Sequence, residues 1–110
     1  MNRRDVIIIE KLIKEADFVK QMLDGLTESD FLNNQEKQRA TVMTLLNIGE
    51  LVKNLTMEFR SQHPQIPWKS IAGLRDVAAH GYFTLRMEEI WVYATSDLPR
   101  IISHLPPNPH

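Results

Sequence analysis

The chain has 110 residues, of which 43% are hydrophobic and 25% charged, with a formal net charge of −1 and no cysteine. This composition predicts one globular domain over residues 1–105 and excludes thiol catalysis, a disulfide scaffold and a cysteine zinc site. The charge argues against non-specific DNA binding, because duplex-binding proteins carry a positive excess that neutralises phosphates. The longest apolar run, residues 6–9, is far shorter than the ~20 residues of a membrane span. Since a signal-peptide cleavage site is also lacking, we expect a cytoplasmic protein.

The N-terminal region predicts a long amphipathic helix over residues 3–24. Its apolar residues recur at alternating spacings of three and four, which place them on one stripe of a helix. They are Ile9, Leu12, Ala16, Val19, Leu23 and Leu26. We expect Asn2 to cap the start and Gly25 to supply the left-handed residue after the end. Residues 27–30 have the spacing of a capping box, with Asp in place of Glu, and predict a short helix ending near Asn33.

Residues 35–60 predict a second long helix with its own apolar stripe. The stripe contains Val42, Leu45, Gly49, Val52, Leu55 and Phe59. Glycine inside a helix costs about 1 kcal/mol relative to alanine, so we expect Gly49 to mark a point where another helix crosses closely. Asn47, Glu50 and Asn54 form a polar strip beside the stripe. This strip is either a solvated face or the polar lining of a shared cleft.

The second half of the chain predicts two further helices. Pro64 and Pro67 indicate a turn, with Pro67 as the first residue of the third helix. Thr84 is the expected cap of a fourth helix, which Pro99 should kink or end, and residues 106–110 form a proline-rich flexible tail. No segment alternates as a strand does. The predicted fold is therefore all-α, a four- to five-helix up-and-down bundle.

One stretch of the third helix combines residue types that could carry chemistry. Arg75, Asp76, His80 and Tyr82 stand there among small and apolar neighbours. Arginine is permanently charged and grips phosphate oxygens with a planar fork, whereas histidine can accept or deliver a proton near neutral pH. Arg75 and His80 are therefore a candidate pair for phosphate chemistry.

The spacing of this pair restricts how it could work. On a straight helix Arg75 and His80 point about 140° from each other. They converge only if the helix gives way near Gly81, or if two copies of the chain face each other across a two-fold axis. A purely structural interpretation is also open, in which Asp76 hydrogen-bonds His80, Arg75 caps carbonyls and Tyr82 packs.

The sequence predicts no metal site and no cofactor. There is no H-x-x-x-H motif and no acidic cluster with metal-ligand spacing. The four glycines are scattered, so no glycine-rich phosphate loop is expected.

A series of short motifs follows one another along the chain. They are Ile48-Gly49-Glu50, Ile66-Pro67-Trp68, Ile71-Ala72-Gly73-Leu74-Arg75-Asp76, His80-Gly81-Tyr82, Trp91 and Asp97-Leu98-Pro99. This ordered set resembles the HepT-like branch of the HEPN superfamily, small all-helical proteins usually encoded beside a minimal nucleotidyltransferase. The resemblance covers roughly residues 5–105.

The resemblance implies a function and a set of site residues. Arg75 and His80 match the R-x-x-x-x-H motif of the superfamily, and Tyr82 completes its R-x-x-x-x-H-x-Y form, with Glu50 and Gly81 in support. Members are described as toxins that act as metal-independent RNases, in homodimers whose motifs meet in a cleft. The nucleotidyltransferase is the antitoxin, and in some systems it transfers AMP to the motif tyrosine, here Tyr82.

Asp76 departs from the pattern of this branch, which often has Asn after the arginine. A carboxylate there could raise the pKa of His80, and it weakens the attraction of the site for RNA. Two functions stay open. The first is the RNase toxin, favoured by the intact Arg75, His80 and Tyr82. The second is a non-catalytic helical module that binds a nucleotide, or organises a dimer, beside a nucleotidyltransferase.

Overall fold

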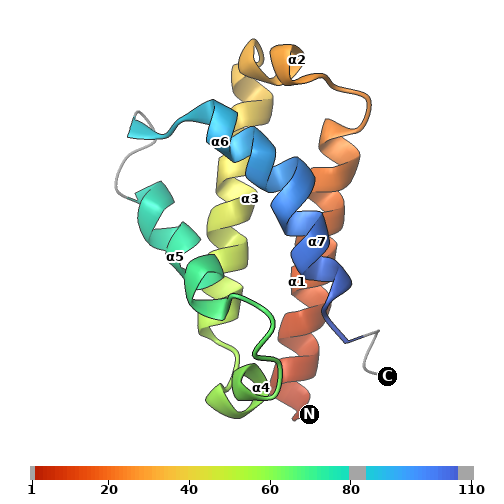
Figure 1. The fold of residues 1–110 in the computed structure, drawn as a ribbon, viewed down its shortest axis with the longest axis vertical. Helices are drawn as coiled ribbons and strands as arrows, with labels where there is room; N and C mark the ends of the chain where they lie inside the picture. The colour runs from red at the N-terminus through yellow and green to blue at the C-terminus, as the bar shows by residue number, and fades with distance from the viewer. Residues whose placement is uncertain (1, 80–83, 107–110) are drawn as a thin grey trace.

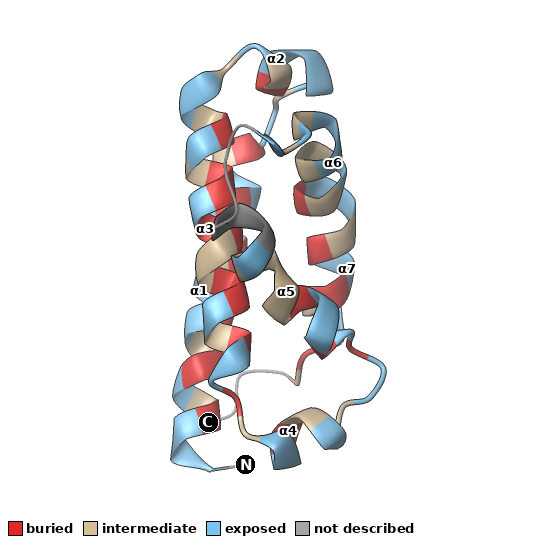
Figure 2. Cartoon of the chain, turned by 90° about the vertical axis from the view of Figure 1, so that its left-hand side faces the viewer, coloured by how far each residue is buried: buried red, intermediate tan, exposed pale blue. Residues whose placement is uncertain are grey.

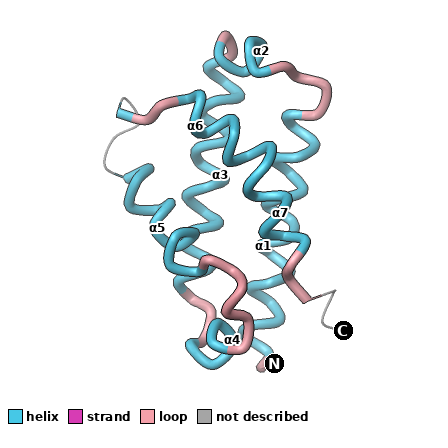
Figure 3. Tube along the Cα trace, in the orientation of Figure 1, coloured by secondary structure: helices cyan, strands magenta, loops and turns pink. Residues whose placement is uncertain are grey.

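The computed structural model describes residues 2–79 and 84–106, and this part of the chain is helical without any strand (Figures 1 and 3). In chain order the elements are α1 (Arg3–Leu23), α2 (Glu28–Leu32), α3 (Gln35–Lys53), α4 (Met57–Ser61), α5 (Trp68–Ala79), α6 (Met87–Val92), the π-helical turn η2 (Tyr93–Asp97) and α7 (Leu98–Ser103). The predicted all-α bundle is confirmed. Within the described residues, no helix combines the length and apolar character needed to cross a membrane.

The long helices α1 and α3 run antiparallel, and the other elements pack against them (Figure 1). The most extensive contact in the molecule is between α3 and α5, followed by that between α1 and α3. The continuous helical run of α6, η2 and α7 lies across α1 and α3. The predicted residues His80, Gly81 and Tyr82 fall outside the described residues, as do residues 107–110 of the predicted tail.

The start of the chain follows the sequence prediction closely. The Asn2 side chain accepts a hydrogen bond from the Asp5 backbone N–H at 2.8 Å and so caps α1. Gly25 follows the helix with a φ of 80°, the left-handed conformation that glycine adopts without strain. Thr27 and Asp30 form the predicted capping box reciprocally, at 2.9 and 3.1 Å, and start α2.

The prediction of one helix over residues 35–60 is wrong, because α3 ends at Lys53 and α4 starts separately at Met57. The Thr56 backbone N–H and hydroxyl donate to the Asp5 carboxylate at 2.9 and 2.7 Å. The same hydroxyl oxygen accepts from the Phe59 N–H and caps α4. A carboxylate on α1 thus draws Thr56 out of the helical hydrogen-bond pattern, although the apolar periodicity continues across the break.

The predicted cap at Thr84 is also wrong. The N-cap position of α6 is occupied by Arg86, whose side chain makes no capping hydrogen bond. Glu88 and Glu89 stand in the first turn, where negative charge complements the positive end of the helix dipole. Charge therefore takes the place of a capping hydroxyl at this helix start.

Pro99 does not end the last helix, contrary to one of the two expected outcomes. It lies in the first turn of α7, directly after the π-helical turn. Within that turn the Leu98 N–H bonds to the Tyr93 carbonyl, five residues back. A proline ring in a regular helix collides with the carbonyl four residues before it, and the wider turn gives that ring room.

Two apolar clusters hold the helices together, and the buried positions face inward between them (Figure 2). The larger cluster joins α1, α3, α5 and α7, and includes Ile9, Leu12, Ile48, Val52, Trp68, Ile71, Leu98 and Ile101. The smaller one joins α1, α2 and η2 through Val19, Leu23, Phe31 and Ala94. Trp91 packs against it, with its ring centroid 5.4 Å from that of Phe31.

Gly49 is the point of closest approach between α3 and α5, as the sequence predicts. A Cβ atom at this position would lie 2.8 Å from the Arg75 backbone nitrogen and 3.0 Å from the Ile71 carbonyl oxygen. Only glycine allows the two backbones to come so near. The crossing therefore fixes the middle of α5, and with it Arg75, against α3.

Candidate active site

The helix crossing at Gly49 brings Arg75 beside Glu50. The Arg75 Nε lies 2.6 Å from the Glu50 Oε2, so the two side chains form a short ion pair. Both side chains are about half exposed, at 43% and 50%. An exposed pair of this kind contributes little to stability, typically about 0–1 kcal/mol. Its effect is to set the direction in which the guanidinium points.

The arginine keeps donors for a further partner. A guanidinium carries five N–H groups in one plane, and Glu50 engages the one on Nε. Of the two terminal nitrogens, Nη1 lies 3.9 Å from Asp76 Oδ1, and the arginine side chain is 43% exposed. Terminal N–H groups of a partly exposed guanidinium can donate to the oxygens of a phosphate.

The charges of these three side chains do not favour an anion by themselves. Arg75 contributes one positive charge, whereas Glu50 and Asp76 contribute one negative charge each, which leaves a net charge of −1. Asp76 is 67% exposed, so water screens much of its effect. A phosphate at Arg75 therefore depends on attraction from other cations.

Glu50 also lines a groove between α1 and α3. The groove has a volume of about 450 Å³, and its other polar walls include Asn47, Asn54 and Lys14. The Asn47 amide donates to the Glu15 carboxylate at 3.3 Å across the two helices. The sequence left open whether the polar strip of Asn47, Glu50 and Asn54 is a solvated face or the lining of a cleft. It is both, because the strip is partly exposed and also lines this groove.

The remaining predicted site residues are His80, Gly81 and Tyr82, which lie outside the described residues. The structure describes α5 as far as Ala79, so it positions Arg75, Asp76 and Glu50 relative to one another. The pairing of Arg75 with His80 stays a prediction. In the described part of the chain, no group of three or more His, Asp or Glu side chains is placed to hold a metal ion.

Tyr93 has the one clearly shifted pKa among the described residues. Burial raises the pKa of its phenol to about 12, and the nearby Asp97 carboxylate adds to the shift. The hydroxyl is buried and has no hydrogen-bond partner within the described part of the chain. Tyr93 packs against the larger apolar cluster.

A second group of polar residues was not singled out by the sequence. Lys53, Arg60 and Lys69 come from α3, α4 and α5, and they line one pocket beside the Gly49 crossing. Their spacing along the chain matches no known motif, so the sequence alone does not connect them. The only signal was the expected crossing of two helices, which brings their flanking positions together.

The ordered motifs of the sequence agree with a comparison to known proteins. The model of the family described as "Ribonuclease HepT-like" matches residues 12–106. The chain belongs to the HepT-like family. This assignment confirms the resemblance seen in the sequence, and the matched region runs from within α1 to three residues beyond α7.

Several HepT-like relatives are similar over most of their length. A protein of Caldanaerobacter subterraneus subsp. tengcongensis named "Putative RNase" is 38% identical over 93 residues, 84% of this chain and 83% of its own. A "Putative RNase" of Methanocaldococcus jannaschii is 37% identical, over 89% of this chain and 78% of its own. A "Probable ribonuclease HepT" of Thermococcus cleftensis is 29% identical, over 92% of both chains. No solved structure gives a significant match.

Proposed function

We propose that this chain is a ribonuclease that cleaves RNA with Arg75 and His80 and without a metal ion. The observation that supports this most directly is the arginine of the family motif, held at Nε by Glu50 with its side chain 43% exposed. The relatives named as RNases add to that support. RNA is the substrate class because its 2′-hydroxyl supplies a nucleophile next to each phosphate.

The proposed reaction is an internal transesterification. One His80 takes the proton from the 2′-hydroxyl, the 2′-oxygen bonds to phosphorus, and the bond from phosphorus to O5′ breaks. A second His80 delivers a proton to the leaving O5′, which gives a 2′,3′-cyclic phosphate and a 5′-hydroxyl. Arg75 stabilises the charge that develops on the phosphate oxygens.

The active form is a homodimer in this proposal, because one chain carries a single histidine and a single arginine of the motif. Three large apolar side chains on α1 and α3 support it, since Ile7, Phe18 and Met43 are 41%, 50% and 58% exposed. Single apolar side chains are common on protein surfaces, so these three add to the proposal only as positions that a second chain could cover. Light scattering should give twice the 12.8 kDa of the chain, whereas a monomer at micromolar concentration would contradict a shared site.

The test of the activity combines two variants with a chelator. Single-stranded RNA should be cut in the presence of EDTA, with a 2′,3′-cyclic phosphate in the mass spectrum of the product, and DNA should remain intact. Arg75→Ala and His80→Ala should each lower kcat by about 10²–10³-fold, the usual loss for a transition-state donor or proton-transfer group. Arg75→Lys should recover part of the loss. Activity that survives both alanine variants, or that EDTA abolishes, would contradict the mechanism.

We further propose that the chain is the toxin of a pair whose antitoxin is a minimal nucleotidyltransferase. That enzyme would use ATP to add AMP to Tyr82, releasing pyrophosphate. The added phosphate would compete for the donors that an RNA phosphate needs. Peptide mass analysis after incubation with the partner and ATP should find the adduct on Tyr82, and Tyr82→Phe should prevent it. Inhibition without an adduct would indicate control by occlusion instead.

A non-catalytic role beside the nucleotidyltransferase is the second candidate, and the net charge of −1 over Arg75, Glu50 and Asp76 favours it. In that case purified protein would bind a nucleotide or its partner and leave RNA intact under all conditions. The cleavage assay above separates the two functions.

A further inference from the structure

The pocket lined by Lys53, Arg60 and Lys69 is a concave surface whose charged lining residues are all cations. Its volume is about 540 Å³, and Met57, Ser61, Trp68 and Ala72 complete its wall. No carboxylate stands among the lining residues that the structure describes. The neighbouring groove between α1 and α3 differs, because Lys11 and Lys14 there are matched by Glu15 and Glu50. A groove on α1 has three cations too, Arg3, Arg4 and Lys11, but there Arg4 already donates to the Asn54 side chain.

The cations of this pocket are available to a ligand. Within the described part of the chain, none of the three forms an ion pair. The Nε of Arg60 is buried and has no hydrogen-bond partner there. The first residues of α5 also line the pocket, and the positive end of that helix dipole adds to the attraction.

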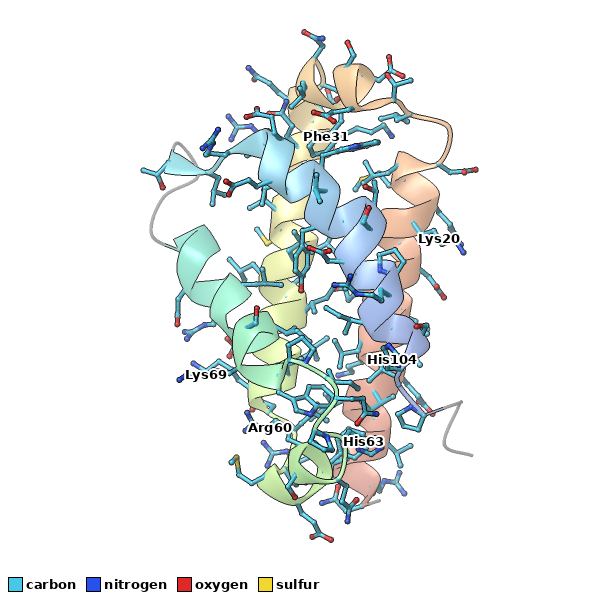
Figure 4. All side chains as sticks on the ribbon, in the orientation of Figure 1. Lys20, Phe31, Arg60, His63, Lys69 and His104 are labelled. Atoms are coloured by element: carbon cyan, nitrogen blue, oxygen red, sulfur yellow. The ribbon has the colours of Figure 1, made fainter. Side chains whose placement is uncertain are left out.

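The walls of the pocket are held in place by the fold. Trp68 is buried, and its indole N–H donates to the carbonyls of Arg60 and His63, each at 3.0 Å. These bonds fix the end of α4 against the start of α5. Arg60 and Lys69 accordingly lie on the same side of the molecule, whereas Lys20 lies on the other side (Figure 4).

The pocket also lies next to the candidate active site. Ala72 belongs to its wall and meets α3 at the Gly49 crossing, three residues before Arg75. Lys53 follows Glu50 by three residues on α3, nearly one helical turn. Lys69 precedes Arg75 by six residues, about 9 Å along the helix axis. At 100° per residue the two side chains also point about 120° apart around that axis, so a strand that contacts both passes around α5 and covers at least this distance. A stacked strand rises about 3.4 Å per nucleotide, so the minimum is roughly two or three nucleotides.

We infer that this pocket binds a phosphate of the RNA strand at least two or three nucleotides from the one that is cleaved. The inference rests on the proposed ribonuclease function. The cations of the pocket supply the attraction for RNA that Arg75, Glu50 and Asp76, with their net charge of −1, lack. An oligonucleotide would reach both the pocket and Arg75, whereas a dinucleotide, with its single phosphate, could occupy only one of them.

The experiment compares two double variants that remove the same charge. Lys53→Gln with Lys69→Gln removes two exposed cations of the pocket, and Lys20→Gln with Arg100→Gln removes two exposed cations elsewhere. Each protein is assayed on an RNA of about 10 nucleotides, within the range of single-strand site sizes, and on the dinucleotide at which that RNA is cut. Circular dichroism confirms that each variant is folded. The measured quantity is the ratio of kcat/KM on the oligonucleotide to kcat/KM on the dinucleotide.

The pocket variant should lower this ratio about tenfold, and the control pair should leave it within about twofold. The salt dependence of oligonucleotide binding should also become shallower, by about 0.7 in the slope of log K against log salt for the one phosphate contact that is lost. Equal ratios in the two double variants would overturn the inference while leaving the ribonuclease function intact.

If the wild-type protein cuts no RNA, the proposed function fails, and fluorescence anisotropy of the same oligonucleotide decides about the pocket. Weaker binding by the pocket variant than by the control pair would then support the phosphate site. Equal binding by the two double variants would overturn it.

Discussion

The chain uses two carboxylates to join helices, and it uses them in opposite ways. Asp5 is 2% exposed and accepts hydrogen bonds from the backbone N–H and hydroxyl of Thr56. Glu50 is half exposed and pairs with the cation of Arg75. The buried carboxylate satisfies neutral donors that have no other acceptor, so it stabilises the fold. The exposed one competes with water and orients a side chain that can still bind a substrate.

The largest effect on stability should come from Asp5→Ala. This change leaves the Thr56 N–H and hydroxyl without their acceptor in a partly buried place and should lower the free energy of unfolding by about 3 kcal/mol. Urea unfolding followed by circular dichroism measures it. Ribonuclease activity per folded molecule should be unchanged. A loss below about 0.5 kcal/mol would mean that the two carboxylates do not differ as their burial suggests.

Removal of a buried polar group that has no partner should not lower the free energy of unfolding, in contrast to removal of Asp5. Tyr93 is such a group within the part of the chain that the structure describes. Burial raises the pKa of its phenol to about 12, above the value of 10.0 that applies when the chain is unfolded. The unfolded state therefore loses this proton first as pH rises. The free energy of unfolding therefore has its full value below pH 10 and falls between about pH 10 and 12, by about 3 kcal/mol for the two pKa units.

The variant Tyr93→Phe isolates this contribution. At neutral pH its stability should equal or slightly exceed that of the wild type, because the hydroxyl it removes has no partner among the described residues. The difference in unfolding free energy between the two proteins should grow in favour of Phe above pH 10. A difference that is independent of pH would contradict the raised pKa.

Two changes at Glu50 should separate its hydrogen bond from its charge. Glu50→Ala should lower kcat about tenfold, because the guanidinium loses the group that directs it. Glu50→Gln keeps an oxygen that can accept from Arg75 Nε, so kcat should stay within about threefold, and KM should fall as one negative charge is removed. Both variants should unfold within about 0.5 kcal/mol of the wild type. A large loss of stability in either would show that the pair is structural after all.

The smallest effect is expected at Asp76, which lies 3.9 Å from Arg75 and is 67% exposed. Asp76→Asn should lower KM for RNA about two- to threefold at low salt, with the difference vanishing as salt screens the charge. The control is Asp97→Asn, which removes a negative charge from a different element, the C-terminal helical run. If both changes alter KM equally, the effect is one of overall charge and not of the site.

Local signals predicted those parts of the fold that depend on local interactions. The caps at Asn2 and Thr27 and the periodicity of α1 could be read from neighbouring residues. The break between α3 and α4 could not, because its cause is a carboxylate on Asp5, 51 residues away. The stripe of apolar residues continues through the break, so periodicity alone predicts an unbroken helix.

In the candidate site too, the sequence predicted some features, whereas others depend on contacts between distant residues. The motif identified Arg75 and Asp76, and the glycine on an apolar helix face predicted the crossing that brings Glu50 to the arginine. The cationic pocket could not be predicted, since its charges come from three helices and no spacing in the sequence connects them. Only the packing of α4 against α5 brings Arg60 and Lys69 together.

The π-helical turn between α6 and α7 allows one continuous helical run to pack against both apolar clusters. Ala94 faces the cluster around Phe31, and Leu98 and Ile101 face the one around Ile9. A π-helical turn contains one more residue than an α-helical turn. Every side chain beyond it is therefore rotated by about 100° relative to its place in a regular helix. The length of this segment is therefore under tighter constraint than its composition. Loss of a single residue between Tyr93 and Asp97 would turn the apolar face of α7 away from α1, whereas many substitutions at the exposed Thr95 and Ser96 would leave the packing unchanged.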